Sequence, residues 1–229
     1  MSTVPVPFPA MPPAAIVFDC DGLLLDTEGS WSVGQAGLFA RHGREFEPEH
    51  KQALVGRSML EAGPIYERFL DRPGHGTDLT DELVALVVEE LGRTGCAPMP
   101  GAVELLDRLA GRSRLAVASN APRAVLEAAI AGAGVRDRFE AAVSADDVPR
   151  PKPAPDIYLE ACRRLGADPA ASVALEDTAT GLAAARAAGM RTIGVPSVST
   201  AASALEADLV AGSLLDPAVL AFLGLTPDG

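Results

Sequence analysis

The sequence predicts an α/β fold, in which a parallel sheet is covered by helices on both faces and a helical segment is inserted after the first strand. Four short apolar runs rich in strand-forming residues each stop abruptly at polar or turn-forming residues. Helical patterns separate the last three of these runs. Strands that alternate with helices of this length pair in parallel and are buried on both faces.

The four predicted strands span residues 15–18, 114–118, 172–175 and 191–195. The first is followed by Asp19-Cys-Asp-Gly22, the second by Ser119-Asn120 and the third by Glu176-Asp177. In an open parallel sheet, ligands bind at the carboxyl ends of the strands. These polar residues are therefore predicted to line one site.

The predicted helices alternate with the strands. Apolar residues from Ile157 to Leu165 recur on one face, and Gly166 is placed to end that helix. Asp216-Pro217 has the form of a helix start, with an N-cap followed by proline at the first helical position. Two further helical patterns cover residues 125–130 and 178–190.

The segment between the first and second strands has a different character. It shows helical patterns at residues 31–41, 49–69 and 80–92 and no strand pattern. We therefore expect a discontinuous α/β core made of residues 15–27 and 99–229, with a helical cap over the strand ends at residues 28–98. Residues 1–14 contain five prolines and no basic region, which predicts a flexible, extended tail.

Composition excludes several classes of protein. The chain has 229 residues, a hydrophobic fraction of 48% and a formal net charge of −12, with a sequence pI near 4.6. A globular protein this acidic is a poor partner for nucleic acid or an anionic membrane. Three scattered cysteines with no CxxC pair predict neither disulfides nor zinc, and no apolar run approaches a membrane span. We expect a cytoplasmic protein.

Asp19 and Asp21 are the first candidates for chemistry. In an extended chain, residues i and i+2 point the same way, about 6–7 Å apart. Two carboxylates this close push one pKa upward, so that one serves as nucleophile and the other can hold a proton. The alternative is that Asp-Gly simply makes a turn.

Glu176 and Asp177 end another predicted strand. Together with Asp19 they would gather carboxylate oxygens where a hard cation such as Mg²⁺ could bind. The alternative is a helix start with acidic residues at the positive end of its dipole, and the two interpretations are compatible.

Ser119, Asn120 and Lys152 are candidates for holding a phosphate. The first two offer a hydroxyl, an amide and backbone N–H groups between a strand and a helix, although a plain N-cap has the same appearance. Lys152 is one of only two lysines in the chain and is flanked by Pro151 and Pro153. A stiff loop of this kind favours an anion contact, and an exposed loop charge is the alternative.

Taken together, these elements resemble the haloacid dehalogenase superfamily, in its β-phosphoglucomutase-like and sugar-phosphatase branch. Residues 18–28, FDCDGLLLDTE, are similar to that family's first motif. Ser119 stands where the second motif is expected, KPAPDIY at residues 152–158 resembles the third, and LEDTATGLAAARAAGM at residues 175–190 resembles the fourth. The resemblance covers nearly the whole chain after residue 14. It implies a Rossmann-like core with an inserted cap.

The resemblance also implies a role for each motif residue. Asp19 would attack phosphorus and form an aspartyl-phosphate, and Asp21 would act as general acid and then general base. Mg²⁺ would be held by Asp19, the backbone carbonyl of Asp21 and Asp177, with Glu176 nearby. The phosphoryl oxygens would be held by Ser119, Asn120 and Lys152.

Substrate choice is expected to depend on the helical segment. Arg57, in Leu54-Val-Gly-Arg-Ser-Met-Leu60, lies where this branch carries a cap loop that reaches the active site, and it is the candidate for a second substrate contact. The alternative is a solvated surface charge. Trp31 stands where the phosphoglucomutases carry a histidine, and none of the chain's three histidines fits that position.

These observations favour a Mg²⁺-dependent phosphatase of a small phosphorylated metabolite, such as a sugar phosphate. A phosphosugar mutase is the runner-up, and a catalytically silent binding protein is the third possibility. The dehalogenases of the superfamily fit less well, because they use no metal and lack the acid at Asp21. Cys20 is interpreted as the variable residue between two aspartates, and we expect a monomer.

Overall fold

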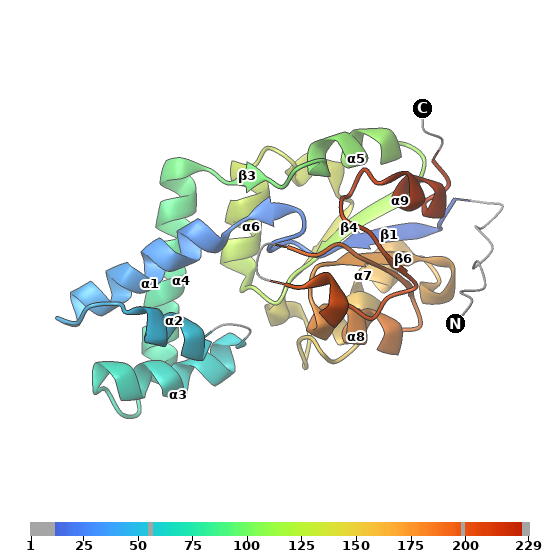
Figure 1. The fold of residues 1–229 in the computed structure, drawn as a ribbon. Coiled ribbons are helices and arrows are strands. Elements are labelled where there is room, and N and C mark those ends of the chain that lie inside the picture. The colour runs from blue at the N-terminus through green and yellow to red at the C-terminus, as the bar shows by residue number, and fades with distance from the viewer. Residues whose placement is uncertain (1–11, 55–56, 198–199, 226–229) are drawn as a thin grey trace.

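A computed structural model describes residues 12–54, 57–197 and 200–225 and contains one six-stranded sheet (Figure 1). Its strands are β1 (Ala15–Phe18), β4 (Arg114–Ala118), β5 (Ala141–Val143), β6 (Val173–Glu176), β7 (Arg191–Gly194) and β8 (Leu209–Val210). They lie in the order β5-β4-β1-β6-β7-β8, and every neighbouring pair is parallel. The order changes direction at β1, so the crevice outside its carboxyl end is where such sheets bind ligands.

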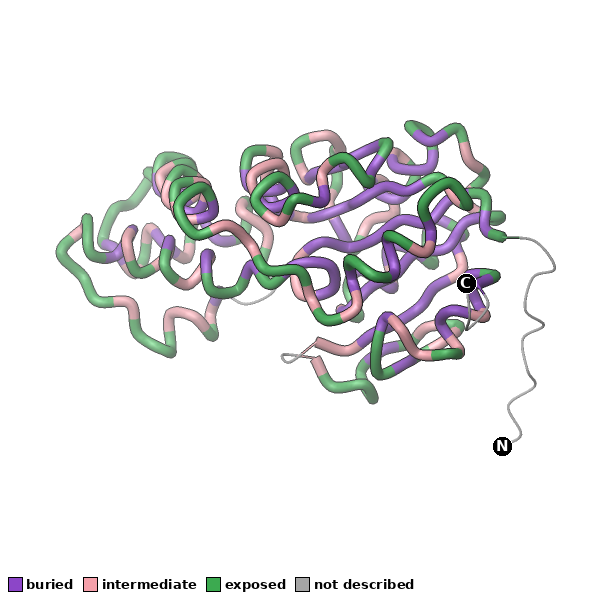
Figure 2. The backbone as a smooth tube through the Cα atoms, turned by 90° about the horizontal axis from the view of Figure 1, so that it is seen from above, coloured by how far each residue is buried: buried purple, intermediate pink, exposed green. Residues whose placement is uncertain are grey.

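Helices cover both faces of this sheet. They are α5 (Ala102–Leu109), α6 (Arg123–Gly132), α7 (Asp156–Leu165), α8 (Ala179–Ala187) and α9 (Pro217–Phe222). Side chains of β1 alternate between the two resulting cores: Ile16 and Phe18 join the cluster that contains α5, α6 and α9, whereas Ala15 and Val17 pack against α7 and α8. Figure 2 shows the central strands as continuously buried segments. The predicted α/β class is confirmed.

The inserted segment consists of helices grouped on one side of the sheet (Figure 1). They are α1 (Glu28–Arg41), α2 (Pro48–Leu54), α3 (Met59–Leu70) and α4 (Gly76–Thr94). Two short strands, β2 (Leu25–Asp26) and β3 (Ala97–Pro98), pair antiparallel where the chain enters and leaves this group. Helix α4 packs on α1, on α3 and also on α6 of the core, so one apolar cluster runs from the inserted helices into the sheet.

The predicted strands lie within a residue of those observed. The expected helix at residues 49–69 is two helices, and the segment expected to have no strand includes β3. Most of the predicted tail, residues 1–11, lies outside the described residues. Its last residues are held against the core, because the Ala14 N–H donates to Ala171 O and Pro13 is buried. No helix among residues 12–54, 57–197 and 200–225 has the length and apolar character needed to cross a membrane.

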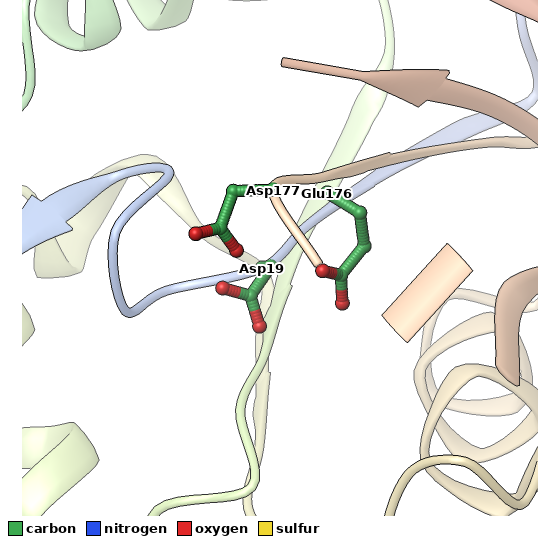
Figure 3. Close-up of side chains that lie close together, drawn as sticks. All are labelled: Asp19, Glu176 and Asp177. Carbon is green, nitrogen blue, oxygen red and sulfur yellow. The ribbon is translucent and has the colours of Figure 1, made fainter. Parts of the chain in front are cut away.

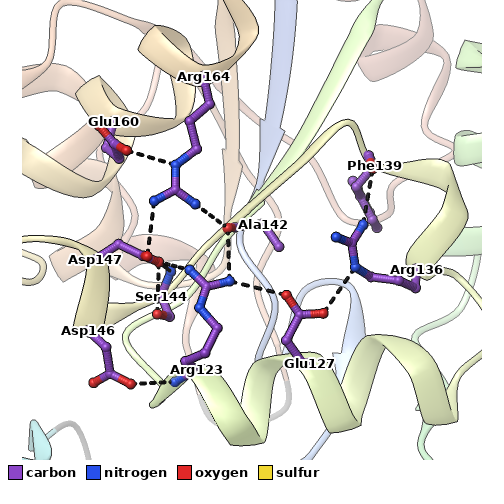
Figure 4. A network of polar contacts seen from close by, with 10 residues as sticks. All are labelled: Arg123, Glu127, Arg136, Phe139, Ala142, Ser144, Asp146, Asp147, Glu160 and Arg164. Carbon is purple, nitrogen blue, oxygen red and sulfur yellow. Dashed lines mark hydrogen bonds and ion pairs between the residues drawn. The ribbon is translucent and has the colours of Figure 1, made fainter.

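Two arginines protect the exposed edge of strand β5. Arg123 and Arg164 both donate to the carbonyl oxygen of Ala142, at 3.2 and 2.9 Å, and both also contact the carboxylate of Asp147 (Figure 4). Asp147 further accepts hydrogen bonds from the N–H and hydroxyl of Ser144. An edge strand whose carbonyl is occupied in this way offers less template for pairing with another chain.

Asp147→Ala is expected to lower the free energy of unfolding by about 2–3 kcal/mol, because it removes a partly buried acceptor shared by two guanidinium groups. Urea denaturation measures this loss. The matched control is Asp137→Ala, which removes an exposed aspartate from the short 3₁₀ helix Arg136–Arg138 that precedes β5. Equal midpoints for the two variants would show that the Asp147 network does not stabilise the fold.

Candidate active site

The carboxyl ends of β1, β4 and β6 bring the predicted site residues together. Asp19 follows β1, Ser119 follows β4, and Glu176 ends β6. The backbone keeps its sheet hydrogen bonds through these positions, since the N–H of Asp19 donates to Leu175 O and that of Ser119 donates to Val143 O. The sheet therefore fixes where each side chain starts.

Three carboxylates form the centre of the site. Asp19, Glu176 and Asp177 are all buried, and one oxygen from each lies within 4.8 Å of the others (Figure 3). Such a group repels itself unless positive charge is placed among its members. A cation among these carboxylates would offset that repulsion.

Lys152 supplies one such cation. Its ammonium donates to Asp19 Oδ1, to Glu176 Oε1 at 2.7 Å and to Ala118 O at 2.9 Å. These three acceptors use all three ammonium N–H donors. Although burial alone would lower it, the carboxylates of Asp19 and Glu176 hold the pKa of Lys152 well above its ordinary value. Lys152 is thus a buried, charged group in contact with Asp19, and not an exposed loop charge.

One ammonium does not balance three carboxylates. Burial, followed by the charge of Glu176, raises the pKa of the Asp19 carboxyl well above its ordinary range, even though Lys152 acts in the opposite direction. The same two causes raise the pKa of Asp177 to about 6. A second cation at this point would keep both carboxylates ionised at neutral pH.

The residues present fit a divalent metal ion at this point. Among the buried side-chain nitrogen and oxygen atoms of the described residues, Asp177 Oδ1 is the one that lacks a hydrogen-bond partner. Gly22 lies against the same carboxylate, with a φ of +85°, and a Cβ there would come within 2.6 Å of Asp177 Oδ2. A carboxylate oxygen that no protein donor reaches is the type of ligand that Mg²⁺ prefers.

Asp21 lies beside this cluster and has its own partners. Its Oδ1 accepts from the Thr27 hydroxyl and its Oδ2 from the Ser119 hydroxyl, both at 2.6 Å. Thr27 directly precedes α1, so this contact joins the strand-end turn to the start of the inserted helices. The pattern at residues 19–22 is therefore more than a turn, because it places two carboxylates among different sets of donors.

Asn120 has a role that its sequence position did not reveal. Its side-chain carbonyl accepts from the N–H of Lys152 at 2.9 Å, and its amide donates to Lys152 O at 3.1 Å. This two-way contact ties the loop after β4 to the loop that carries Lys152. The Asn120 side chain bonds to the backbone N–H and carbonyl oxygen of Lys152. The type of side chain at residue 152 therefore gave no indication of this contact.

The predicted substrate contact at Arg57 is not joined to this cluster. Its side chain is 53% exposed and lies 3.8 Å from Glu61, and no described contact links it to Asp19 or Lys152. Its neighbour Gly56 lies outside the described residues. Trp31 is half-buried and packs against the main apolar cluster. Burial raises the pKa of the Cys20 thiol well above its ordinary value, which agrees with a passive role.

The family profile described as haloacid dehalogenase-like hydrolase matches residues 13–189 of the chain. The CbbY protein of Rhodobacter capsulatus is 36% identical over 203 residues, which cover 81% of this chain and 86% of that protein. Fructose-1-phosphate phosphatase YqaB of Escherichia coli (strain K12) is 30% identical over 189 residues, covering 80% and 96%. The chain spans about half (54%) of the bifunctional riboflavin kinase/FMN phosphatase of Arabidopsis thaliana, with 31% identity over 206 residues.

Solved structures agree with these matches. CbbY of Rhodobacter sphaeroides, in complex with phosphate, superposes with a TM-score of 0.80 at 29% identity, covering 93% of this chain and all of that one. A Thermotoga maritima protein assigned as a β-phosphoglucomutase gives a TM-score of 0.70 at 25% identity, covering 86% and 93%. The chain therefore belongs to the haloacid dehalogenase-like hydrolase family, in its β-phosphoglucomutase-like and sugar-phosphatase branch, and is a phosphoric monoester hydrolase.

Proposed function

We propose that the chain is a Mg²⁺-dependent phosphatase of a small sugar phosphate and that it works through an aspartyl-phosphate. The observation that supports this most directly is the buried contact between Asp19 and Lys152, beside an Asp21 held by two hydroxyl groups. A nucleophile, a cation for the phosphoryl oxygens and a separate proton carrier are what this reaction requires.

The proposed reaction has two steps. In the first, a carboxylate oxygen of Asp19 bonds to phosphorus, the ester P–O bond breaks, and Asp21 gives its proton to the leaving alcohol oxygen. In the second, Asp21 takes a proton from water as that water bonds to phosphorus, and the bond between Asp19 and phosphorus breaks to release inorganic phosphate. Lys152 and the Ser119 hydroxyl would hold the phosphoryl oxygens, and each would give up a contact of the free protein to do so, Lys152 to Asp19 and Ser119 to Asp21.

Asp19, Asp177 and the backbone carbonyl of Asp21 would hold Mg²⁺ in this proposal. When bound, the ion supplies positive charge that offsets the repulsion between a carboxylate and a phosphate dianion. The prediction that Glu176 is a further ligand stays a prediction. Both of its oxygens meet protein donors in the structure: Lys152 and Tyr158 at Oε1, and Thr178 at Oε2.

Asp177→Asn is expected to raise the Mg²⁺ concentration for half-maximal activity at least tenfold, because it replaces a charged ligand with a neutral one. Calorimetric titration of the protein with Mg²⁺ should show the same weakening without reference to turnover. Asp137→Asn, an equal charge change at an exposed site, serves as the control. If both variants bound Mg²⁺ like the wild type, Asp177 would not be a ligand.

A sugar phosphate is the proposed substrate class because YqaB, a relative matched over most of its length, is a fructose-1-phosphate phosphatase. Hydrolysis is favoured over mutase chemistry by the positions of the histidines. His42 contacts Glu82, His75 contacts Asp78, and His50 packs among the rings of Phe39 and Phe69. All three therefore have partners within the inserted helices.

Further parts of the proposal concern the setting of the enzyme. Residues 28–98 would act as a cap that encloses the substrate, and Arg57 would reach a second polar group of the substrate when the cap closes. We propose a cytoplasmic monomer that acts without a nucleic-acid or membrane partner. The net charge of −12 supports the last point, because phosphate-rich surfaces would repel the chain.

The test is phosphate release from a panel of phosphorylated metabolites, with Mg²⁺ and with EDTA. We expect metal-dependent release from sugar phosphates and a rate lowered by about 10⁴-fold or more for Asp19→Asn. If the protein converted a sugar phosphate into its isomer without releasing inorganic phosphate, it would be a mutase and not a phosphatase. No change in any compound would favour a binding protein.

A further inference from the structure

Behind the reacting groups lies a fully buried carboxylate whose hydrogen-bonding capacity is taken up by protein. Glu176 Oε1 accepts from Lys152 and from the Tyr158 hydroxyl, each at 2.7 Å. Its Oε2 accepts from the hydroxyl and the N–H of Thr178, at 3.0 and 3.3 Å. The side chain of Glu176 is 0% exposed. Four donors from three residues thus fix one anion.

Tyr158 belongs to this group, and the proposed reaction does not use it. It comes from α7, on the face of the sheet opposite to α6, and is itself completely buried. Its hydroxyl bonds to Glu176, and its ring centroid lies 5.0 Å from the Lys152 ammonium. Phenylalanine would fill this core position equally well, so packing alone does not explain the hydroxyl.

The Glu176 carboxylate is packed closely against the start of α8. Gly181, in the first turn of α8, approaches so closely that a Cβ at that residue would fall 1.7 Å from Glu176 Oε1. Thr178 holds the other oxygen from the N-terminus of the same helix. The carboxylate is therefore confined by α8 on one side and by the Tyr158 hydroxyl on another.

We propose that Tyr158 is a positioning residue for the reaction: by donating to Glu176, it fixes where that carboxylate holds the Lys152 ammonium relative to Asp19. This inference rests on the proposed function. Without the phenol proton, Oε1 would keep Lys152 as its sole donor. The ammonium would then move toward Glu176 and away from Asp19 and the transferring phosphoryl group. A displacement of about 1 Å at such a group is enough to slow catalysis.

The first experiment compares two tyrosine variants. Tyr158→Phe is expected to lower kcat about tenfold with KM changed less than threefold, because the loss falls on the transition state. Tyr66→Phe is the matched control, since Tyr66 is the chain's only other tyrosine, is also buried, and has a hydroxyl bonded to Gln35 in the inserted helices. Equal kinetics for the two variants would overturn the proposal.

A double-mutant cycle separates positioning from general packing. If Tyr158 acts through Glu176, adding Tyr158→Phe to Glu176→Gln should cost less than a further twofold in kcat. A full additional tenfold loss would show that Tyr158 acts independently of Glu176 and would overturn the proposal. Urea denaturation of all four proteins confirms that each is folded under the assay conditions.

A second measurement needs no turnover, because the chain contains only two lysines. Lysine labelled with ¹³Cε and ¹⁵Nζ gives one NMR signal from buried Lys152 and one from Lys51, which is 41% exposed. We expect Tyr158→Phe to shift the Lys152 signal and leave the Lys51 signal unchanged. An unmoved Lys152 signal would overturn the positioning role, whereas a wild type without phosphatase activity would overturn only the proposed function.

Discussion

Asp19→Asn is expected to lower kcat by about 10⁴-fold or more, because the amide has almost the same shape as the carboxylate but cannot attack phosphorus. The carboxylate lies at the end of β1, where the sheet hydrogen bonds and the Lys152 contact fix its direction. No neighbouring carboxylate can replace it from the same position. Steady-state hydrolysis of the best substrate in the panel measures the loss.

The stability of the same variant provides the control. Asp19 is one of three crowded carboxylates, and its pKa is raised by burial and by Glu176. Removing this charge relieves repulsion, so we expect the urea midpoint of Asp19→Asn to equal or exceed that of the wild type. A folded variant that hydrolyses substrate at more than a hundredth of the wild-type rate would exclude Asp19 as nucleophile. Asp19→Ala checks that the result does not arise from deamidation.

The covalent intermediate can be observed directly in the same proteins. If an acyl phosphate forms on Asp19, wild-type protein quenched with acid during turnover of a ³²P-labelled substrate should carry the label. Hydroxylamine should then release that label. Asp19→Asn should remain unlabelled. Label retained by that variant would place the nucleophile elsewhere.

The central strands and their site residues could be predicted because both depend on local pattern. The apolar run at residues 15–18 coincides with β1, which ends just before Asp19, and the run at 114–118 coincides with β4. Strand β5, with only Ala-Ala-Val, and the two-residue strand β8 are too short to show a period. Their assignment depends on pairing with strands far away in the sequence.

The contacts that organise the site were beyond sequence reasoning for a related reason. On α7, Tyr158 occupies the same apolar face as Ile157 and Leu165, so its spacing indicates only burial. The structure shows that its hydroxyl reaches Glu176 at the end of β6. Thr27 and Asn120 likewise act on residues whose proximity comes from tertiary packing. Sequence patterns indicated the candidate reacting groups, but the contacts of these groups could be found only from the fold.

Asp21→Asn is expected to slow both steps of the reaction with an alkyl phosphate, but only the second step with an activated aryl phosphate. An alkyl phosphate needs a proton on its leaving oxygen, so its hydrolysis should fall by about 10²–10⁴-fold. The p-nitrophenolate group of p-nitrophenyl phosphate leaves without a proton, so the first step with this substrate should be nearly unaffected. The second step still lacks its general base, and the aspartyl-phosphate should therefore accumulate.

Stopped-flow absorbance tests this directly, because the variant should release one p-nitrophenolate per active site in a burst and then turn over slowly. The Asp21 carboxylate contacts Thr27 and Ser119, and no described hydrogen bond joins it to Lys152, so its loss should leave the contact between Lys152 and Asp19 in place. Asp26→Asn, the same change at an exposed aspartate in β2, should keep wild-type kinetics on both substrates. If Asp21→Asn slowed the alkyl and aryl substrates equally and gave no burst, its role would be to hold the site together, and the general acid would have to be another group.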